Sequence, residues 1–157
     1  MPDDSLLREH LLELLHGGHA HAALDDVVND FPIDLAGIRP EGSPHSAWEL
    51  LEHIRIAQED ILRFSQAPGH ESPPWPKGYW PSSPEPRDPA QWHATVGAIW
   101  RDLADFETLI KERDVLEKFP WGDGQTLARE AMLLADHNSY HLGQMVLLRR
   151  LLGAWEK

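Results

Sequence analysis

The chain contains no cysteine, and this absence excludes disulfide bonds, thiolate metal ligands and thiol nucleophiles. It also has no run approaching the roughly 18 consecutive apolar residues of a transmembrane helix, so neither a membrane span nor a membrane partner is predicted. The first residues, MPDDSLLREHLLELL, are acidic and amphipathic and lack the basic start of a secretory signal peptide. We therefore expect a cytoplasmic protein.

Basic side chains are scarce, with 14 Lys and Arg against 26 Asp and Glu and a formal net charge of -12. A nucleic-acid-binding protein needs a basic surface to neutralise phosphates, and the densest basic feature here is the pair Arg149 and Arg150. No nucleic-acid partner is therefore expected. The length of 157 residues, 41% of them apolar, suffices for one domain with a hydrophobic core, predicted to span residues 1–157.

Apolar residues recur at helical spacing in four long segments, and neither a strand pair nor an internal repeat is visible. The first segment is interrupted at Gly17 and Gly18 and continues as a shorter helix. The pattern predicts an all-α protein built as a four-helix bundle. The predicted helices span residues 5–16 with a continuation at 22–29, about 43–65, about 88–113 and about 125–152.

Capping residues indicate where two of these helices begin. Ser43 is predicted to cap the second long helix, because serine is a good N-cap and Pro44 suits the first helical position. Asp88, which Pro89 follows, is predicted to cap the third.

The segment between the second and third helices, residues 67–88, is rich in proline and tryptophan. Eight of the 13 prolines fall within residues 68–89, which excludes a helix or a central strand there. A loop of this length inside a compact domain is often functional. Trp75, Tyr79 and Trp80 are predicted to pin it to the bundle. Two roles stay open for the loop: walling a pocket against water, or stapling the surface.

Histidines interrupt the apolar stripe of the last helix. At 100° per residue, His137 and His141 lie on adjacent turns, so both can reach one point beside the helix. On the second helix, His53 shares its face with apolar residues and is predicted to point inward. Three imidazoles from facing helices can hold a divalent metal at roughly 2.0–2.1 Å and leave a position open for water or substrate. The narrow sector predicted to face inward holds Leu133, Leu134, His137, His141, Gln144 and Leu148.

Other polar residues are candidates for supporting roles around His53, His137 and His141. Glu49 and Asp60 lie near the same face of the second helix as His53, and either could orient an imidazole or be a fourth ligand. Gln144 is predicted to orient a ligand or the substrate. The HGGHAH cluster at residues 16–21 could bind metal weakly, although lining a loop is the favoured interpretation. The histidines expected to be surface or capping residues are His10, His16, His19, His21, His45, His70 and His93.

Better-known catalytic motifs do not fit the chain. A zincin needs His-Glu-x-x-His, but Asn138 stands where the glutamate would be. A di-iron bundle needs two Glu-x-x-His motifs, and only Glu13 with His16 matches. No Gly-x-Ser-x-Gly motif marks a serine nucleophile. Any chemistry is therefore expected to run through the metal.

Two segments carry a family resemblance: HSAWELLEHIRIAQEDILRF at 45–64 and DGQTLAREAMLLADHNSYHLGQMVLLRRLLG at 123–153. With the WPKGYWP loop, and with the His-x3-His-x2-Gln spacing near the C-terminus, they resemble the DinB/YfiT-like superfamily of DinB-like domains. The resemblance implies an up-down-down-up four-helix bundle and a metal triad at His53, His137 and His141.

The resemblance also implies an activity. Characterised relatives are metal-dependent, usually with nickel or zinc, and include hydrolase-like enzymes and thiol-dependent transferases and isomerases. A small-molecule substrate is implied, with a low-molecular-weight thiol as one option. Relatives are often dimers through helix faces, and the apolar residues of the last helix permit a homodimer. Those residues are Ala135, Leu142, Met145 and Val146.

Three hypotheses follow from these patterns. In the first, the chain is a metal-dependent hydrolase or thiol S-transferase that activates a water or thiol nucleophile. In the second, it is a non-catalytic, stress-related protein that binds a metal or small ligand. In the third, the histidines are hydrogen-bonded core residues of a structural bundle. A site closed by Glu49 or Asp60 favours storage or structure, whereas an open site beside a pocket favours an enzyme. Imidazole ligands suit zinc, nickel, copper and iron, so the residues do not select the metal.

Overall fold

The computed structural model describes residues 4–155. Within that range all assigned elements are helices, and no strand is assigned. Four longer helices are accompanied by one short helix and two single 3-10 turns. No helix of the described residues has the length and apolar character needed to cross a membrane. The elements are α1 (Ser5–His16), α2 (Leu24–Val28), η1 (Ile33–Leu35), α3 (Ala47–Gln66), η2 (Lys77–Tyr79), α4 (Pro89–Glu112) and α5 (Leu127–Leu151).

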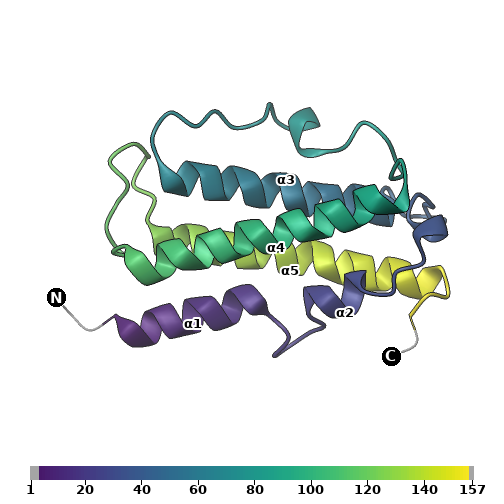
Figure 1. Ribbon diagram of the computed structural model, residues 1–157, viewed down its shortest axis with the longest axis horizontal. Helices are drawn as coiled ribbons and strands as arrows, with labels where there is room; N and C mark the ends of the chain where they lie inside the picture. The colour runs from purple at the N-terminus through teal and green to yellow at the C-terminus, as the bar shows by residue number, and fades with distance from the viewer. Residues whose placement is uncertain (1–3, 156–157) are drawn as a thin grey trace.

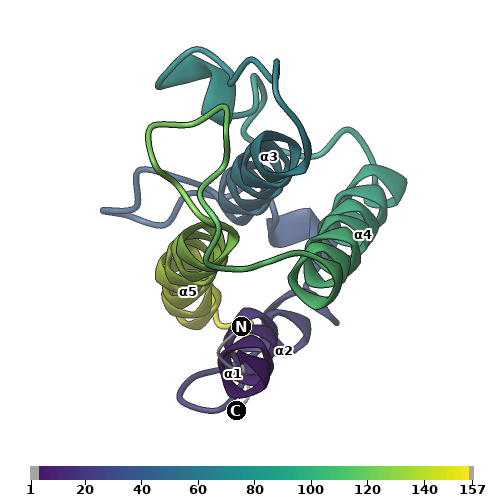
Figure 2. The same ribbon diagram turned by 90° about the vertical axis from the view of Figure 1, so that its left-hand side faces the viewer.

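Seen end-on, α3, α4 and α5 form three corners of the molecule, and α1 with α2 forms the fourth (Figure 2). α3 packs against both α4 and α5, while α1 contacts α4 and α5 from the other side. α1 and α2 run one way, α3 and α4 run the opposite way, and α5 returns (Figure 1). Because α3 and α4 are parallel, the chain at residues 67–88 must travel back along α3, which is about 30 Å long.

A reciprocal pair of hydrogen bonds sets the start of α3. The Glu49 backbone N–H donates to Oγ of Ser46 at 3.2 Å, and the Ser46 N–H donates to Oε2 of Glu49 at 2.8 Å. The predicted start at Ser43 and Pro44 is therefore wrong, because the hydroxyl of Ser43 instead donates to the His45 carbonyl in the preceding turn. The predicted cap of α4 is confirmed, since Asp88 accepts from the Gln91 N–H at 2.8 Å.

The buried apolar residues form two clusters, one towards each end of the bundle. A polar residue of α3, Gln58, separates the two clusters: Ile54, one turn before it, belongs to one cluster, and Leu62, one turn after it, belongs to the other. Nε2 of Gln58 donates to the Ile99 carbonyl of α4 at 2.6 Å, and its Oε1 accepts from Nδ2 of Asn138 of α5 at 2.9 Å. Gln58 is fully buried, and these bonds satisfy it. The side chain thus ties three helices together at mid-bundle.

The side of α5 predicted to face inward lies at the edge of the buried face, and the centre of that face lies further round the helix. Leu134 and Met145 are fully buried, whereas Leu133 is 39% exposed, so its predicted inward position is wrong. Leu133 lies about 100° around the helix from Leu134, beyond the edge that α3 covers. His137 and His141 lie between these directions, which places them where the core meets the outer edge.

The apolar residues of α5 proposed as a dimer surface are mostly inside the molecule. Ala135, Leu142 and Met145 are buried in the core, so the prediction that they leave an apolar face for a second copy is wrong. Their burial follows from α5 contacting α1, α3 and α4 at once. A homodimer would therefore need a different face.

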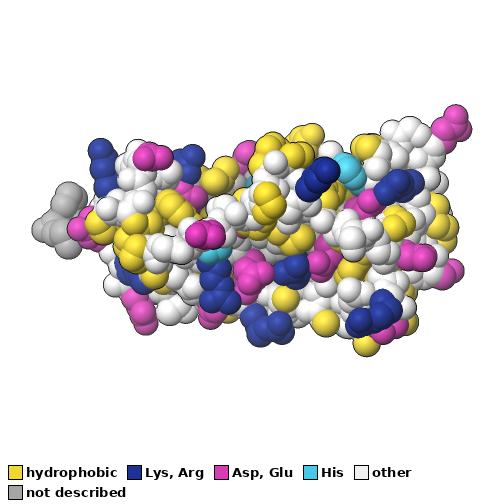
Figure 3. Space-filling model, turned by 90° about the horizontal axis from the view of Figure 1, so that it is seen from above, with side chains coloured by type: hydrophobic (Ala, Val, Ile, Leu, Met, Phe, Trp, Pro, Cys, Tyr) yellow, Lys and Arg dark blue, Asp and Glu magenta, His cyan; other side chains and the backbone are white. Residues whose placement is uncertain are grey.

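The loop at residues 67–88 covers α3. Tyr79 and Trp80 are partly buried, and the η2 turn packs against α3. Trp75 is 77% exposed, and its ring contact is with Tyr79 of the same loop, so the prediction that Trp75 pins the loop to the bundle is wrong. Viewed from above, hydrophobic side chains gather over the middle of this face, with acidic and basic side chains interspersed around them (Figure 3).

A buried arginine closes the end of the bundle where α2 meets α5. The Arg149 guanidinium donates to the carbonyl of Val27, in the last turn of α2, at 2.7 Å, and to that of Asn29, just past the helix end, at 3.3 Å. Its Nε donates to the Ala154 carbonyl at 2.9 Å. Carbonyls at helix ends lack partners within the helix, so one cation here satisfies groups of two segments.

Replacing Arg149 by Met should lower the free energy of unfolding by about 2–4 kcal/mol, because buried carbonyls lose a charged donor. Urea unfolding of the purified protein measures this loss. Arg150→Met is the matched control, because Arg150 is exposed and should cost less than about 1 kcal/mol. Equal losses for the two variants would contradict the assigned role of Arg149.

Candidate metal centre

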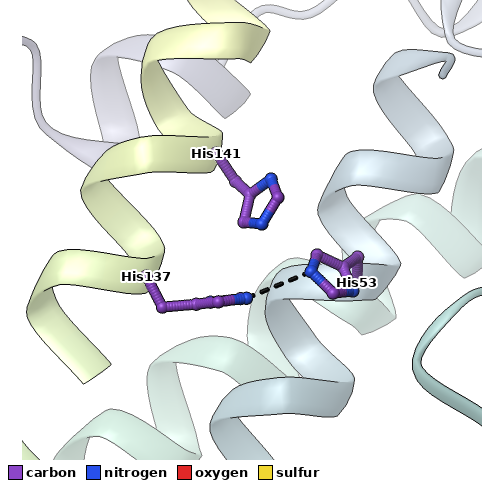
Figure 4. Close-up of side chains that lie close together, drawn as sticks. All are labelled: His53, His137 and His141. Carbon is purple, nitrogen blue, oxygen red and sulfur yellow. Dashed lines mark hydrogen bonds between the residues drawn. The ribbon is translucent and has the colours of Figure 1, made fainter. Parts of the chain in front are cut away.

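Three imidazoles converge between α3 and α5: His53 from α3, and His137 and His141 from adjacent turns of α5 (Figure 4). We call them the histidine triad. One ring nitrogen from each lies within 4.8 Å of the others, and Nε2 of His53 lies 3.0 Å from Nε2 of His137. Two nitrogens bound tetrahedrally to one ion at 2.0–2.1 Å would be about 3.3 Å apart. The triad could therefore hold a metal ion with small adjustments of its rings.

The outward nitrogens of two triad rings have oxygen partners. Nδ1 of His53 lies 2.8 Å from the Tyr79 carbonyl, and Nδ1 of His141 lies 2.7 Å from Oε1 of Gln144. An oxygen without a proton can only accept, so both Nδ1 atoms carry the ring proton. In both rings the lone pair then lies on Nε2. In His53 this nitrogen is the one that faces His137. Partners of this kind fix the tautomer and orientation of metal-binding histidines.

His137 is held less directly. Its Nδ1 lies 3.4 Å from Oδ1 of Asn138, which in turn bonds to the buried Gln58. The polar contact at mid-bundle therefore anchors the neighbour of His137 on α5. His137 is partly exposed, whereas His53 and His141 are buried.

The loop at residues 67–88 supplies part of the environment of His53. The Trp80 ring stacks on the His53 ring at 4.1 Å, with 4° between their planes. The Tyr79 hydroxyl donates to Oδ2 of Asp60 at 2.6 Å, and Nε2 of His70 lies 2.7 Å from Oδ1 of the same carboxylate. Asp60 thus anchors the loop residue whose carbonyl orients His53.

The surroundings keep the triad neutral. Burial lowers the pKa of all three histidines, most strongly for His141, whose pKa falls to about 4. A positive charge on one triad member further disfavours protonation of the next, since His53 lowers the pKa of both His137 and His141. Neutral imidazole is the form that binds metal, so protons compete weakly for the site at pH 7. Burial and the Asp60 carboxylate raise the pKa of Tyr79 to about 12, so its hydroxyl remains a donor.

Neither predicted carboxylate joins the group that could hold an ion. Both oxygens of Glu49 accept from the Arg39 guanidinium, and one also accepts from the Ser46 N–H. Asp60 accepts from His70 and Tyr79. Asp60 therefore acts on His53 only through Tyr79, and Glu49 serves the start of α3. Gln144 bonds directly to a triad member, as its predicted orienting role requires.

His45 is a residue near the site that sequence reasoning missed. The His45 ring stacks on the Trp80 ring with their centroids 3.9 Å apart, so Trp80 contacts both His45 and His53. Burial lowers the pKa of His45. The residue precedes the cap of α3, where helical periodicity carries no information. The HGGHAH cluster, by contrast, forms no metal-binding group within the described residues.

Comparison with known proteins agrees with the motifs. Residues 18–145, more than half of the chain, match the family model of the DinB superfamily, and the match includes the whole triad. No curated protein and no solved structure matches the chain. The family match, together with an all-helical fold that brings the three motif histidines together, shows that the chain belongs to the DinB superfamily.

Proposed function

We propose that the chain is a metal-dependent enzyme whose histidine triad holds a divalent ion, nickel or zinc. The supporting observation is that three neutral imidazoles converge while the outward nitrogens of His53 and His141 bond to oxygens of Tyr79 and Gln144. When bound, the ion would supply Lewis acidity and lower the pKa of a water or thiol ligand. The reaction class is hydrolysis or thiol-dependent transfer on a small molecule.

The surroundings of the triad favour an enzyme over a storage or carrier protein. Three neutral ligands would leave the ion its full charge, which strengthens its effect on a bound nucleophile. Glu49 and Asp60, the two carboxylates predicted to support or complete the site, are engaged by Arg39 and by the loop. Neither is available to close the site. The partial exposure of His137 gives a substrate one direction of approach.

Each of the protein's own groups has a defined task in this proposal. Tyr79 and Gln144 hold the protons of His53 and His141 on their outer nitrogens, so the inner lone pairs stay available. Trp80 shields one face of His53 from water. For the fold, we assign the tandem of α1 and α2 to the first helix of the family's up-down-down-up four-helix bundle.

Replacing any triad histidine by Ala should abolish stoichiometric binding of zinc or nickel and lower its affinity at least about 100-fold, since each supplies one of three ligands. Elemental analysis and calorimetric titration of the purified protein measure both quantities. His93→Ala is the control, because His93 is exposed on α4. Unchanged metal content in His137→Ala would leave a structural role for the histidines and defeat the proposal.

Tyr79→Phe should weaken metal binding about tenfold, because it frees the loop from Asp60 while keeping the backbone carbonyl that holds His53. Ser83→Ala is the matched control: it also removes a loop hydroxyl, one that bonds to the nearby Glu85 carbonyl. Calorimetric titration with zinc compares the two. Equal affinities for the two variants would show that the Asp60 contact does not support the site.

The metal-free protein should lose stability as the pH falls below about 6.5. The pKa of His141 is about 4 in the folded chain and 6.5 when unfolded, so the unfolded state binds more protons in between. The contribution of neutral His141 to the free energy of unfolding is therefore fully present above about pH 6.5. At pH 5 the free energy of unfolding should be lower by about 2 kcal/mol.

Urea unfolding at pH 7.5 and pH 5.0 measures this difference, which should shrink in His141→Asn and persist in His93→Asn. A wild-type protein that is equally stable at both pH values would contradict the assignment of neutral, buried imidazoles.

A further inference from the structure

A hollow of about 250 Å³ lies beside the triad, between residues 41–45 and the C-terminal half of α5. We call it the leucine pocket, because four of its lining residues are leucines. A larger hollow, about 730 Å³, lies instead beside Arg149 and is lined by no triad residue and no direct partner of one. The leucine pocket is lined by residues 41–45, Leu50, Gln144, Leu147, Leu148 and Leu151.

Two lining residues connect the leucine pocket to the triad. Gln144 lines the pocket and accepts the hydrogen bond from Nδ1 of His141. His45 lines it from the other side and stacks on Trp80, which stacks on His53. One side chain, Gln144, therefore separates the pocket from His141, and two, His45 and Trp80, separate it from His53. A molecule in contact with the triad could extend past Gln144 into the pocket.

The lining is mainly carbon and carries little charge. Its only ionisable groups are the Glu41 carboxylate and the His45 imidazole, and it contains no lysine or arginine. The hydroxyl of Ser43 is already used, because it donates to the His45 carbonyl. Within residues 4–155, the ring nitrogens of His45 and the Nε2 of Gln144 have no hydrogen-bond partner, so these two groups can bind a polar atom.

We propose that the leucine pocket binds an uncharged, mainly apolar group of the substrate, and that His45 and Gln144 hold the adjoining polar atom next to the triad. This inference rests on the proposed function and names its substrate class. An anionic group would be removed from water beside Glu41 without a cation to pair with, which is costly. A thiol co-substrate fits only if the part that enters the pocket is neutral.

Hydroxamic acids test the inference, because the hydroxamate binds the metal while its chain probes the pocket. The zinc-loaded full-length protein is titrated in a calorimeter with acetyl, butyryl and hexanoyl hydroxamic acids. Affinity should rise about fourfold for each added methylene. Adipic acid monohydroxamate matches the hexanoyl compound in length but ends in a carboxylate, and it should bind at least about tenfold more weakly.

Leu147→Asn should remove most of the chain-length effect without unfolding the protein, because this leucine is 58% exposed. Leu116→Asn is the control: Leu116 is 59% exposed in the connection between α4 and α5, and its replacement should leave the effect unchanged. A chain-length effect that is absent in the wild type, or equal in both variants, would overturn the inference. So would tight binding of the carboxylate-ended compound.

The metal-free protein provides an arm that is independent of the proposed function. 1-Hexanol should shift the methyl resonances of Leu147, Leu148 and Leu151 but not of Leu116, and hexanoate should shift none of them. Failure to load zinc would count against the proposed function. The hexanol result would still show whether the leucine pocket binds an uncharged apolar group. Sedimentation analysis completes the test: a dimer that Leu147→Asn dissociates would make this face an interface between copies and overturn the inference.

Discussion

A buried imidazole needs a partner for each ring nitrogen, and this requirement organises the middle of the bundle. In His53 and His141 the outer nitrogen meets an oxygen, so the inner lone pair has to find a proton or a metal ion. The three rings face one another at centroid distances between 4.4 and 4.9 Å. Nε2 of His53 and Nε2 of His137 lie 3.0 Å apart, so one proton can bridge them when no ion is bound. Convergence of lone pairs in a largely buried site is what makes the cluster a candidate metal centre rather than three core residues.

The long connection between α3 and α4 is part of this site as well as a crossover. The parallel course of the two helices obliges the chain to return over α3, and its path places the Tyr79 carbonyl and the Trp80 ring against His53. Asp60 then holds Tyr79 from the same helix that carries His53, about two turns further along. The connection that the parallel helices require therefore also orients one triad residue, His53.

Helical periodicity was sufficient to predict the triad and the helices, because the spacing of His137 and His141 and the apolar neighbours of His53 are local features. The features it missed depend on contacts between distant segments. The carbonyl of Tyr79 carries no sequence signal, since every residue has one. The stacking of His45 on Trp80 joins residues 35 positions apart in irregular structure. The start of α3 was misplaced because Ser43 followed by proline and Ser46 with a glutamate three residues later are both capping patterns, and the reciprocal bonds to Glu49 decide between them.

X-ray absorption spectroscopy of the zinc- or nickel-loaded protein tests the central claim most directly, because it counts the imidazoles around the ion. Convergence of the triad predicts three imidazole nitrogens at roughly 2.0–2.1 Å for zinc, with the remaining position filled by a light atom from water or a ligand. A spectrum with fewer than three imidazoles, or one with protein carboxylates in their place, would contradict the account.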